Sequence, residues 1–340
     1  MKIDVLCTDG SPIGITYEDI YGRNGRVGIG GAELALMTVL EGWSKNHEVT
    51  LYNTPLKPNQ SPFEQRATSS FDKNSNRDVL IVFRSPNQKV MEANGYRVWW
   101  STDQNTIGDF GSFSQFVDKI VTISPFHSEF FARTYNIKDA IDIDIPIRTW
   151  EYQNEVEKIP KRLIFTSVPD RGLAHIAEIF PRIKSKIPDA SIIITSDYRL
   201  WGSADPINQK YIDMFRNMDG VVFLGAVERE RLIKEQLKAQ IHLYPCIYDE
   251  LFCIAVAESQ VAGTLPITTT KGALKTTNMG ILIEGFFDQR ARDAFVEKAI
   301  ETMQSDDLPN LQNEVRERAI ERFSLERILK TWDEKVFNDC

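Results

Sequence analysis

At 340 residues, the chain is longer than the size at which a single hydrophobic core usually stops growing, so two domains are expected. Its 42% hydrophobic and 26% charged residues are ordinary for a globular protein, it lacks the run of about 18 apolar residues that a membrane span needs, and its four cysteines form no C-x-x-C pair. The net charge of −8, without any cluster of lysine and arginine, argues against nucleic acid as the main partner.

The N-terminal half alternates short apolar strands with helical segments. It begins with a strand, Ile3–Thr8, where a secreted protein would carry a signal peptide, so a cytoplasmic protein with reduced cysteines is expected. Continuous apolar strands between amphipathic helices indicate a parallel sheet covered on both faces. Further strands are predicted at Glu48–Asn53, Asp78–Phe83, Arg97–Trp100 and Lys119–Ser124, and helices at Ala32–Lys45, Asn87–Asn94 and Pro125–Tyr135.

The second half repeats this pattern after a charged linker, Trp150–Pro160, that ends in proline. The chain closes with an amphipathic helix over about 310–337. Two doubly wound α/β domains are therefore predicted, and ligands of such sheets bind beyond the carboxyl ends of the strands. The predicted strands are Leu163–Thr166, Ser191–Thr195, Val221–Leu224, Ile241–Tyr244, Leu265–Thr268 and Ile281–Ile283, and the predicted helices are Leu173–Lys186, Pro206–Asn217, Arg229–Lys238, Leu251–Ala262 and Gln289–Met303.

The most informative stretch is Tyr244–Pro266, in which a strand passes through a polar turn into an apolar helix. Glu250 stands at the expected helix start and Glu258 about two turns later, so the helical rotation of ~100° per residue leaves the two carboxylates within about 80° of each other. The N–H groups of Leu251 and Phe252 at a helix start, with its positive dipole end, suit a phosphate. The pattern predicts a carboxylate for a sugar, donors for a diphosphate and a second carboxylate for a ribose.

Two further segments carry groups that suit a phosphate. The glycine-rich segment Gly22–Glu33, which includes Gly30 and Gly31, lies between the first strand and the first helix, where its backbone can approach a phosphate closely. It is not a G-x-G-x-x-G sequence, and no acidic residue about 20 positions later supports a nicotinamide cofactor. In the stretch Ser167–Leu173, Arg171 follows the first strand of the second half, and its guanidinium can grip phosphate oxygens through a planar fork.

In this order, these segments resemble family 4 (group 1) of the retaining GT-B glycosyltransferases. The resemblance rests on the Glu-x7-Glu spacing between YP and AGTLPITT, on GGAE and on the Arg-Gly step, and it spans nearly the whole chain. It implies an α/β GT-B fold of two Rossmann-like doubly wound domains that face each other across a cleft. The acceptor-binding domain would cover residues 1–150, the nucleotide-sugar-binding domain 151–309, and a C-terminal helix over 310–340 would cross back to the first domain.

The resemblance also implies a reaction and its site residues. A hexose-type sugar would move from a UDP- or GDP-sugar to a glycan or other hydroxyl acceptor, without a cofactor or a metal. Glu250 would be the catalytic carboxylate that stabilises charge at the anomeric carbon, and Glu258 would bind the ribose hydroxyls. Relatives often carry a second basic residue where this chain has Thr166, so Lys234 is a candidate to help Arg171. The expected donor contacts are Arg171, Ser167, Lys234, Glu258, Gly225, Val227, Gly30, Gly31 and the N–H groups of Leu251 and Phe252.

The segment Val98–Gln104, VWWSTDQ, resembles the stretch in which relatives often read W-x-H-D. Asp103 fits this pattern and is the second expected catalytic residue. Thr102 stands where the histidine would be, so the usual histidine contact to the transferred sugar has no counterpart at this position. His127, at a helix start, is a candidate substitute, and an ordinary surface histidine is the alternative.

Three other interpretations fit parts of the sequence. Asp142 and Asp144 form a D-x-D, the metal-binding signature of the other large glycosyltransferase fold, although the alternation in IDIDIPI favours the polar face of a short strand. A sugar-nucleotide 2-epimerase shares the two-domain shape and would need acid and base groups on both sides of its cleft. A catalytically silent sugar-nucleotide sensor is the third, supported by the missing histidine.

Overall fold

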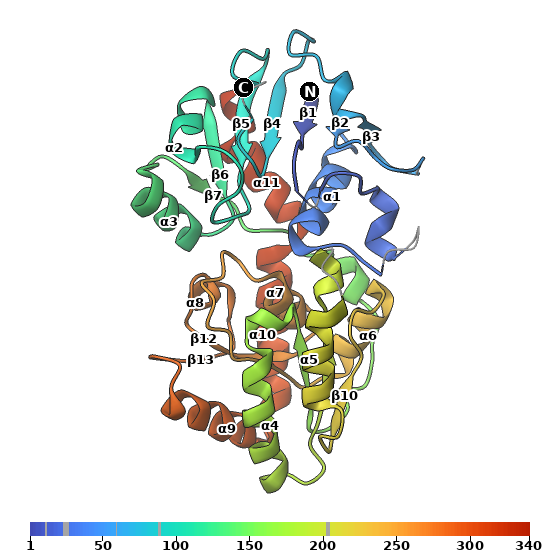
Figure 1. The fold of residues 1–340 in the computed structure, drawn as a ribbon, viewed down its shortest axis with the longest axis vertical. Coiled ribbons are helices and arrows are strands. Elements are labelled where there is room, and N and C mark those ends of the chain that lie inside the picture. The colour runs from blue at the N-terminus through green and yellow to red at the C-terminus, as the bar shows by residue number, and fades with distance from the viewer. Residues whose placement is uncertain (11, 23–26, 59, 88–89, 202–204) are drawn as a thin grey trace. The chain divides into compact units, whose positions relative to one another are not determined.

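The computed structural model describes residues 1–340 except 11, 23–26, 59, 88–89 and 202–204. Packing divides the chain into two units (Figure 1): the first holds most of residues 1–146 together with 325–340, and the second holds residues 147–324. Each unit is built on one parallel sheet with helices on both faces, which confirms the predicted fold class of two doubly wound α/β domains.

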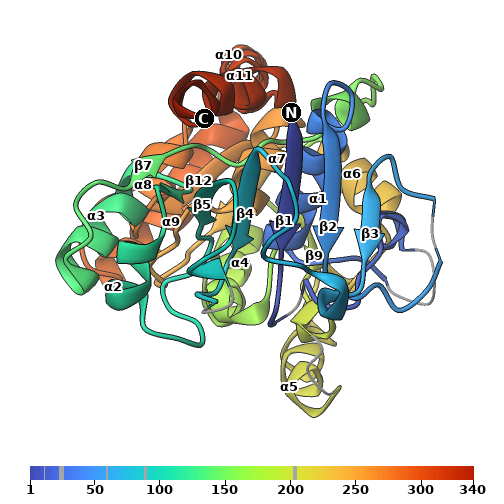
Figure 2. The ribbon, with the colours of Figure 1, turned by 90° about the horizontal axis from the view of Figure 1, so that it is seen from above.

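The sheet of the first unit has the order β3-β2-β1-β4-β5-β6-β7, and Figure 2 shows β4, β1, β2 and β3 side by side. The central strand β1 pairs with a neighbour on each side, so that Val5 lies opposite both Leu51 and Ile81. All neighbouring strands run parallel, so their carboxyl ends meet at one edge of the sheet. The strands are β1 (Lys2–Leu6), β2 (Glu48–Tyr52), β3 (Glu64–Arg66), β4 (Val79–Phe83), β5 (Tyr96–Trp100), β6 (Lys119–Thr122) and β7 (Ile141–Asp142).

Two adjacent tryptophans on β5 show how this sheet is covered. Trp99 packs edge-on against Phe110 with ring centroids 4.8 Å apart, whereas Trp100 packs against Trp332 at 5.3 Å on the other face. Side chains of a strand alternate between faces, so a continuous apolar run fills two cores at once. The helices α2 (Phe110–Phe113) and α3 (Pro125–Tyr135) cover the first face, and α1 (Gly31–Trp43) and α11 (Leu325–Lys335) cover the second.

The sheet of the second unit has the order β10-β9-β8-β11-β12-β13 and is also parallel. Strands β8, β9 and β10 follow one another toward one edge of the sheet, and the chain then returns to place β11 on the other side of β8. The carboxyl ends of β8 and β11 therefore lie at the topological switch point of this sheet. The strands are β8 (Arg162–Thr166), β9 (Ser191–Thr195), β10 (Val221–Phe223), β11 (Ile241–Tyr244), β12 (Leu265–Thr269) and β13 (Ile281–Ile283).

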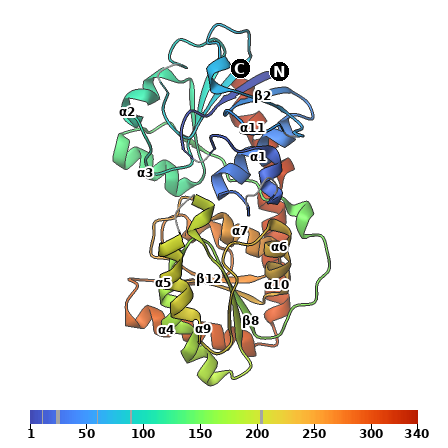
Figure 3. The ribbon, with the colours of Figure 1, turned by 45° about the vertical axis from the view of Figure 1, so that its right-hand side comes forward.

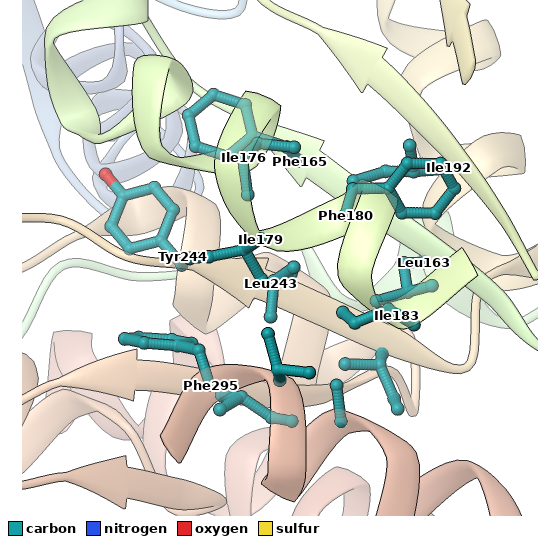
Figure 4. Packing of buried hydrophobic residues seen from close by; sticks show 14 of the residues in the cluster. Leu163, Phe165, Ile176, Ile179, Phe180, Ile183, Ile192, Leu243, Tyr244 and Phe295 are labelled. Carbon is teal, nitrogen blue, oxygen red and sulfur yellow. The ribbon is translucent and has the colours of Figure 1, made fainter. Parts of the chain in front are cut away.

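The larger core of the second unit lies between this sheet and the helices α4 and α9. Figure 4 shows Phe165, Ile179 and Phe295 packed in it, with Tyr244 at its margin and the tyrosine hydroxyl pointing away from the apolar side chains. On the other face α6, α7 and α10 lie together (Figure 3). The helices are α4 (Leu173–Lys186), α5 (Asp205–Phe215), α6 (Arg229–Lys238), α7 (Ile254–Val261), α8 (Leu274–Thr277), α9 (Gln289–Gln304) and α10 (Leu308–Phe323). In the described part of the chain, no helix is both long and apolar enough to cross a membrane.

Besides the short helices α2 and α8, which were not predicted, four features differ from the sequence prediction. The strand β3 was not predicted, because its charged residues EQR carry no apolar signal, and it forms at the sheet edge. A helix was predicted over 87–94, but residues 91–94 form a turn and a bend. Residues 88–89 lie outside the described residues. The single helix predicted over 310–337 is two helices, because Ser324 takes an extended conformation with ψ 143°. The fourth, the start of α7, shapes the candidate site.

Candidate active site

An ion pair between Arg171 and Glu250 lies at the carboxyl ends of β8 and β11. Arg171 Nε lies 3.0 Å from Glu250 Oε1, and both side chains are largely buried, with 14% and 13% of their surface exposed. The hydroxyl of Tyr244, at the end of β11, donates to the same carboxylate at 2.8 Å. The Arg171 guanidinium also stacks on the ring of Tyr248, 3.7 Å from its centroid. The structure thus brings together two of the predicted site residues from stretches that are almost 80 positions apart.

Two glycines make this arrangement possible. Gly172 has φ +100°, and a Cβ there would overlap the carbonyl of Pro245, so the Arg-Gly step lets the backbone of β8's loop lie against that of β11's. Gly272, with φ +56°, lies against the backbone of Glu250, and Ala273 N–H donates to the Glu250 carbonyl at 2.7 Å. The backbone that carries Glu250 is therefore fixed from both sides.

The helix α7 begins at Ile254, later than predicted. Cys253 precedes it with φ +75°, a left-handed conformation that a non-glycine residue rarely takes and that cannot continue a helix upstream. Leu251 and Phe252 are consequently loop residues between Glu250 and the helix, and they are not its first N–H donors. That role passes to Ile254 and its successor, because the first N–H groups of any helix lack an intrahelical partner.

Strained backbone marks both sides of the Arg171–Glu250 pair. Ser167, directly after β8, has φ +148°, and its hydroxyl oxygen lies 3.4 Å from that of Tyr244. With Cys253, this places two non-glycine residues at positive φ beside the pair. Such conformations cost about 1–3 kcal/mol each and concentrate at functional sites. The predicted contact residue Ser167 therefore belongs to the same site as Arg171 and Glu250.

Burial raises the pKa of the Glu250 carboxyl above its ordinary value, while Arg171 and the Tyr244 hydroxyl oppose that rise. The same burial raises the pKa of the neighbouring Cys246 thiol, which Glu250 raises further. The Cys246 thiol is therefore neutral.

Glu258 lies elsewhere in the second unit, on α7, with a partner of its own. Its carboxylate accepts a 2.9 Å hydrogen bond from Arg229 Nη1, and 6% of its side chain is exposed. The helical rotation that was expected to align Glu258 with Glu250 does not apply, because Glu250 precedes the helix. Arg229 was not predicted as a site residue. Its sequence position could have indicated it, because it begins a helix, where the dipole disfavours a positive charge.

The loop 225–227 is held by the end of β9. Ala226 N–H donates to Asp197 Oδ2 at 3.1 Å, and Arg199 Nε donates to the same oxygen at 2.7 Å. Gly225 has φ +68°, and Val227 is half-buried. Lys234, the expected helper of Arg171, is exposed on α6.

Three buried hydroxyls were missed by the sequence reasoning. Thr166 ends β8, Thr195 ends β9 and Ser196 follows it, and the hydroxyl oxygens of all three lack a hydrogen-bond partner among the described residues. Buried polar atoms without partners are rare in folded proteins. They lie at the strand ends of the parallel sheet, which is where ligands of this fold bind.

In the first unit, Asp103 is held by an arginine that follows β4. Arg84 Nη2 donates to Asp103 Oδ1 at 3.1 Å, and Arg84 Nε lies 2.8 Å from Oδ2 as an ion-pair contact. The Thr102 hydroxyl also donates to Asp103, at 3.0 Å. Arg84 has φ +72°, another non-glycine residue in the left-handed region, and Glu33 of α1 lies 3.7 Å from its guanidinium.

The predicted glycines and the histidine occupy defined places near these groups. Gly30 caps α1, and a Cβ there would overlap the Glu33 carboxylate; Gly31 is the first helical residue. Gly25, part of the same sequence segment, lies outside the described residues. His127 is fully buried against Phe131 rather than on the surface, and burial lowers its pKa to about 3, so it is neutral.

The short strand predicted to carry both aspartates holds only one of them: Asp142 ends β7, and Asp144 lies two positions beyond it, outside the strand. Across the described residues, no group of three or more His, Cys, Asp or Glu side chains is placed to hold a metal ion.

Comparison with known proteins identifies the family. The family model described as glycosyl transferases group 1 matches residues 153–322, half of the chain. A sequence search of curated proteins found no significant match.

Solved structures resemble the whole chain. A glycosyltransferase from Rickettsia africae has a TM-score of 0.73 at 15% identity, covering 98% of both chains. HepE from Anabaena, solved with UDP and glucose, has 0.71 at 13%, covering 99% of this chain and 100% of its own. Starch synthase IV from Arabidopsis thaliana, bound to ADP and acarbose, has 0.70 at 10%, covering 98% of both. The fold is that of the GT-B glycosyltransferases, and the chain belongs to the group 1 glycosyltransferases.

Proposed function

We propose that this enzyme is a retaining, family 4 glycosyltransferase that transfers a hexose-type sugar from a UDP- or GDP-sugar to a glycan or other hydroxyl acceptor. The observation that carries the proposal is the Arg171–Glu250 ion pair at the switch point of the second sheet. It joins a cation for a diphosphate to a carboxylate for a sugar in one largely buried place. The resemblance to structures solved with UDP and glucose, or with ADP, supports a nucleotide sugar as donor.

The donor diphosphate takes the place of the Glu250 carboxylate as partner of Arg171. Its oxygens accept from the guanidinium, from the first N–H groups of α7 and from the hydroxyls of Ser167 and Thr166. These fixed donors neutralise the diphosphate without a metal ion. The loop 225–227 lies against the base, and Glu258 accepts hydrogen bonds from the ribose hydroxyls.

During transfer, the bond between the anomeric carbon and the diphosphate oxygen breaks, and its electron pair leaves with the nucleoside diphosphate. The anomeric carbon gains positive character, which the Glu250 carboxylate stabilises. The acceptor oxygen attacks from the side that the diphosphate leaves, so the configuration is retained, and the acceptor hydroxyl proton passes to a phosphate oxygen. The acceptor binds the first unit, where Asp103 and its partner Arg84 offer polar groups at the strand ends.

A donor screen tests this function. UDP-, GDP- and ADP-hexoses are added one at a time, thermal unfolding is recorded, and released nucleoside diphosphate is measured with and without simple sugar acceptors. A donor present at 100 times its dissociation constant is expected to add about 2.7 kcal/mol of stability. Release of nucleoside diphosphate supports the proposal. Interconversion of one donor into another would show an epimerase, and binding without release would show a sensor.

A further inference from the structure

Four charged side chains of alternating sign form a buried network around Glu258. Arg148 Nε donates to Glu151 Oε1 at 2.6 Å, the other oxygen of Glu151 accepts from Arg229 Nε, and Arg229 Nη1 donates to Glu258 Oε1 at 2.9 Å. Arg148 and Glu151 belong to the turn after the first unit, Arg229 begins α6, and Glu258 lies on α7. Three separate segments of the second unit thus meet at one guanidinium.

The burial of this network distinguishes it from ordinary surface ion pairs. The side chains of Arg148, Arg229 and Glu258 are 1%, 7% and 6% exposed, and that of Glu151 is 12% exposed. Exposed pairs form and break freely, whereas buried charges must keep their partners. The network is electrically neutral as a set, so each charge holds the next in place.

Arg229 is placed against the preference of its own helix. It is the first residue of α6, where the N-terminal dipole disfavours a positive charge. Its interactions with Glu151 and Glu258 are what keep it there. Because a single guanidinium grips carboxylates on two of its edges, it fixes the direction of both.

The consequence for Glu258 is a fixed carboxylate. A glutamate side chain has three rotatable bonds and loses considerable rotamer freedom when it is ordered. Arg229 holds Oε1, and among the described residues no hydrogen bond engages Oε2, which can therefore accept from a ligand in a set direction. A carboxylate ordered in advance reads a pair of vicinal hydroxyls better than a mobile one.

We propose that Arg229, itself held by Glu151, is a positioning residue that fixes Glu258 for the ribose of the donor and so gives the enzyme its preference for ribonucleotide over 2′-deoxyribonucleotide donors. This inference rests on the proposed function, in which Glu258 accepts from the ribose. Beyond that function, it assigns Arg229 and Glu151 the role of orienting Glu258, and it names the ribose 2′-hydroxyl as the group that they select for.

Calorimetry with two probes tests the inference. Whichever of UDP, GDP and ADP binds the wild-type enzyme is compared with its 2′-deoxy form, and the ratio of the two dissociation constants measures ribose selection. A hydrogen bond to a charged group corresponds to roughly a tenfold to hundredfold ratio. Arg229→Gln is expected to weaken the ribonucleotide at least about tenfold, to leave the deoxynucleotide nearly unchanged, and so to bring the ratio close to one.

Two further variants keep the test decisive if Arg229→Gln does not fold. Glu151→Gln leaves the Arg229–Glu258 pair in place but loosens Arg229, so the ratio is expected to fall partway. Glu235→Gln is the matched control. It removes a buried carboxylate from α6, the helix that Arg229 begins, where Glu235 pairs with Arg231 at 2.8 Å. The ratio is expected to stay at the wild-type value in this variant. In steady-state kinetics, Arg229→Gln and Glu151→Gln raise the donor KM with little change in kcat, because the ribose contact is the same in ground and transition states.

Two results would overturn this inference while leaving the donor site in place. One is a ratio of dissociation constants that stays at the wild-type value in folded Arg229→Gln and Glu151→Gln. The other is a wild-type enzyme that binds the ribonucleotide and its 2′-deoxy form equally well. A wild-type enzyme that binds none of the three nucleotides would overturn the proposed function as well.

Discussion

Replacing Glu250 with glutamine is the sharpest test of the proposed chemistry. Glutamine has the same shape and can still accept the hydrogen bond that Tyr244 donates at 2.8 Å, but it carries no charge. The substitution therefore removes the electrostatic contribution of the carboxylate and leaves the local packing in place. Because Arg171 loses its carboxylate partner in this variant, the fold is checked by far-UV circular dichroism and thermal unfolding.

The size of the effect follows from the burial of the carboxylate. With 13% of its side chain exposed, Glu250 acts through a medium of effective dielectric constant about 20, in which two unit charges about 4 Å apart interact by about 4 kcal/mol. The anomeric carbon carries only part of a charge in the transition state, so we expect a loss of about 2.7 kcal/mol, which corresponds to roughly a hundredfold in kcat. Donor KM is expected to change little.

The assay is steady-state release of nucleoside diphosphate with one donor and a saturating acceptor. Asp249→Asn is the matched control, because it makes the same charge change at the adjacent, exposed position and is expected to keep wild-type kcat. Full turnover in Glu250→Gln, or an equal loss in both variants, would show that the Glu250 charge does not stabilise the transition state. Glu258→Gln provides the contrast: its loss is expected in donor KM rather than in kcat.

Three other outcomes follow from the same geometry. Arg171→Gln is expected to raise the donor dissociation constant by about tenfold to a hundredfold, measured by calorimetry, and unchanged affinity would remove Arg171 from the site. Because Arg171 opposes the raised pKa of Glu250 in the free enzyme, the acid limb of kcat/KM is also expected to move to higher pH in this variant. Gly172→Ala is expected to lower the free energy of unfolding by about 1–3 kcal/mol more than Gly285→Ala in urea titrations, since both have positive φ but only Gly172 faces the Pro245 carbonyl; equal losses would contradict this. Activity is expected to persist in excess EDTA, and a loss that magnesium or manganese restores would support a metal at Asp142 and Asp144 instead.

The fold could be predicted from the sequence wherever apolar patterning was continuous. The strands β11 and β13 and the helices α3 and α6 have the predicted bounds, because buried strands and capped amphipathic helices leave strong local signals. The strand β3 could not be predicted, since its three residues are polar and their conformation comes from pairing with β2. The break at Ser324 left no proline or glycine to mark it, and it follows from two helices packing on different units.

The candidate site could be predicted only in part. Motif order identified Arg171 and Glu250, but their ion pair depends on the parallel pairing of β8 with β11, which a linear sequence does not display. The start of α7 was misplaced because the left-handed conformation of Cys253 is set by its surroundings and not by its residue type. Arg84 and Arg229 were missed for a related reason: each pairs with a predicted carboxylate on another element, and the packing of the elements brings the two together.

The proposed role of Glu250 in glycosyl transfer is tested by measuring nucleoside diphosphate release from a panel of UDP- and GDP-hexoses, side by side for the wild-type enzyme and Glu250→Gln. The structure predicts release from at least one donor by the wild type and roughly a hundredfold slower release by the variant. Failure of the wild type to release nucleotide from any donor, or equal rates for the two proteins, would contradict it.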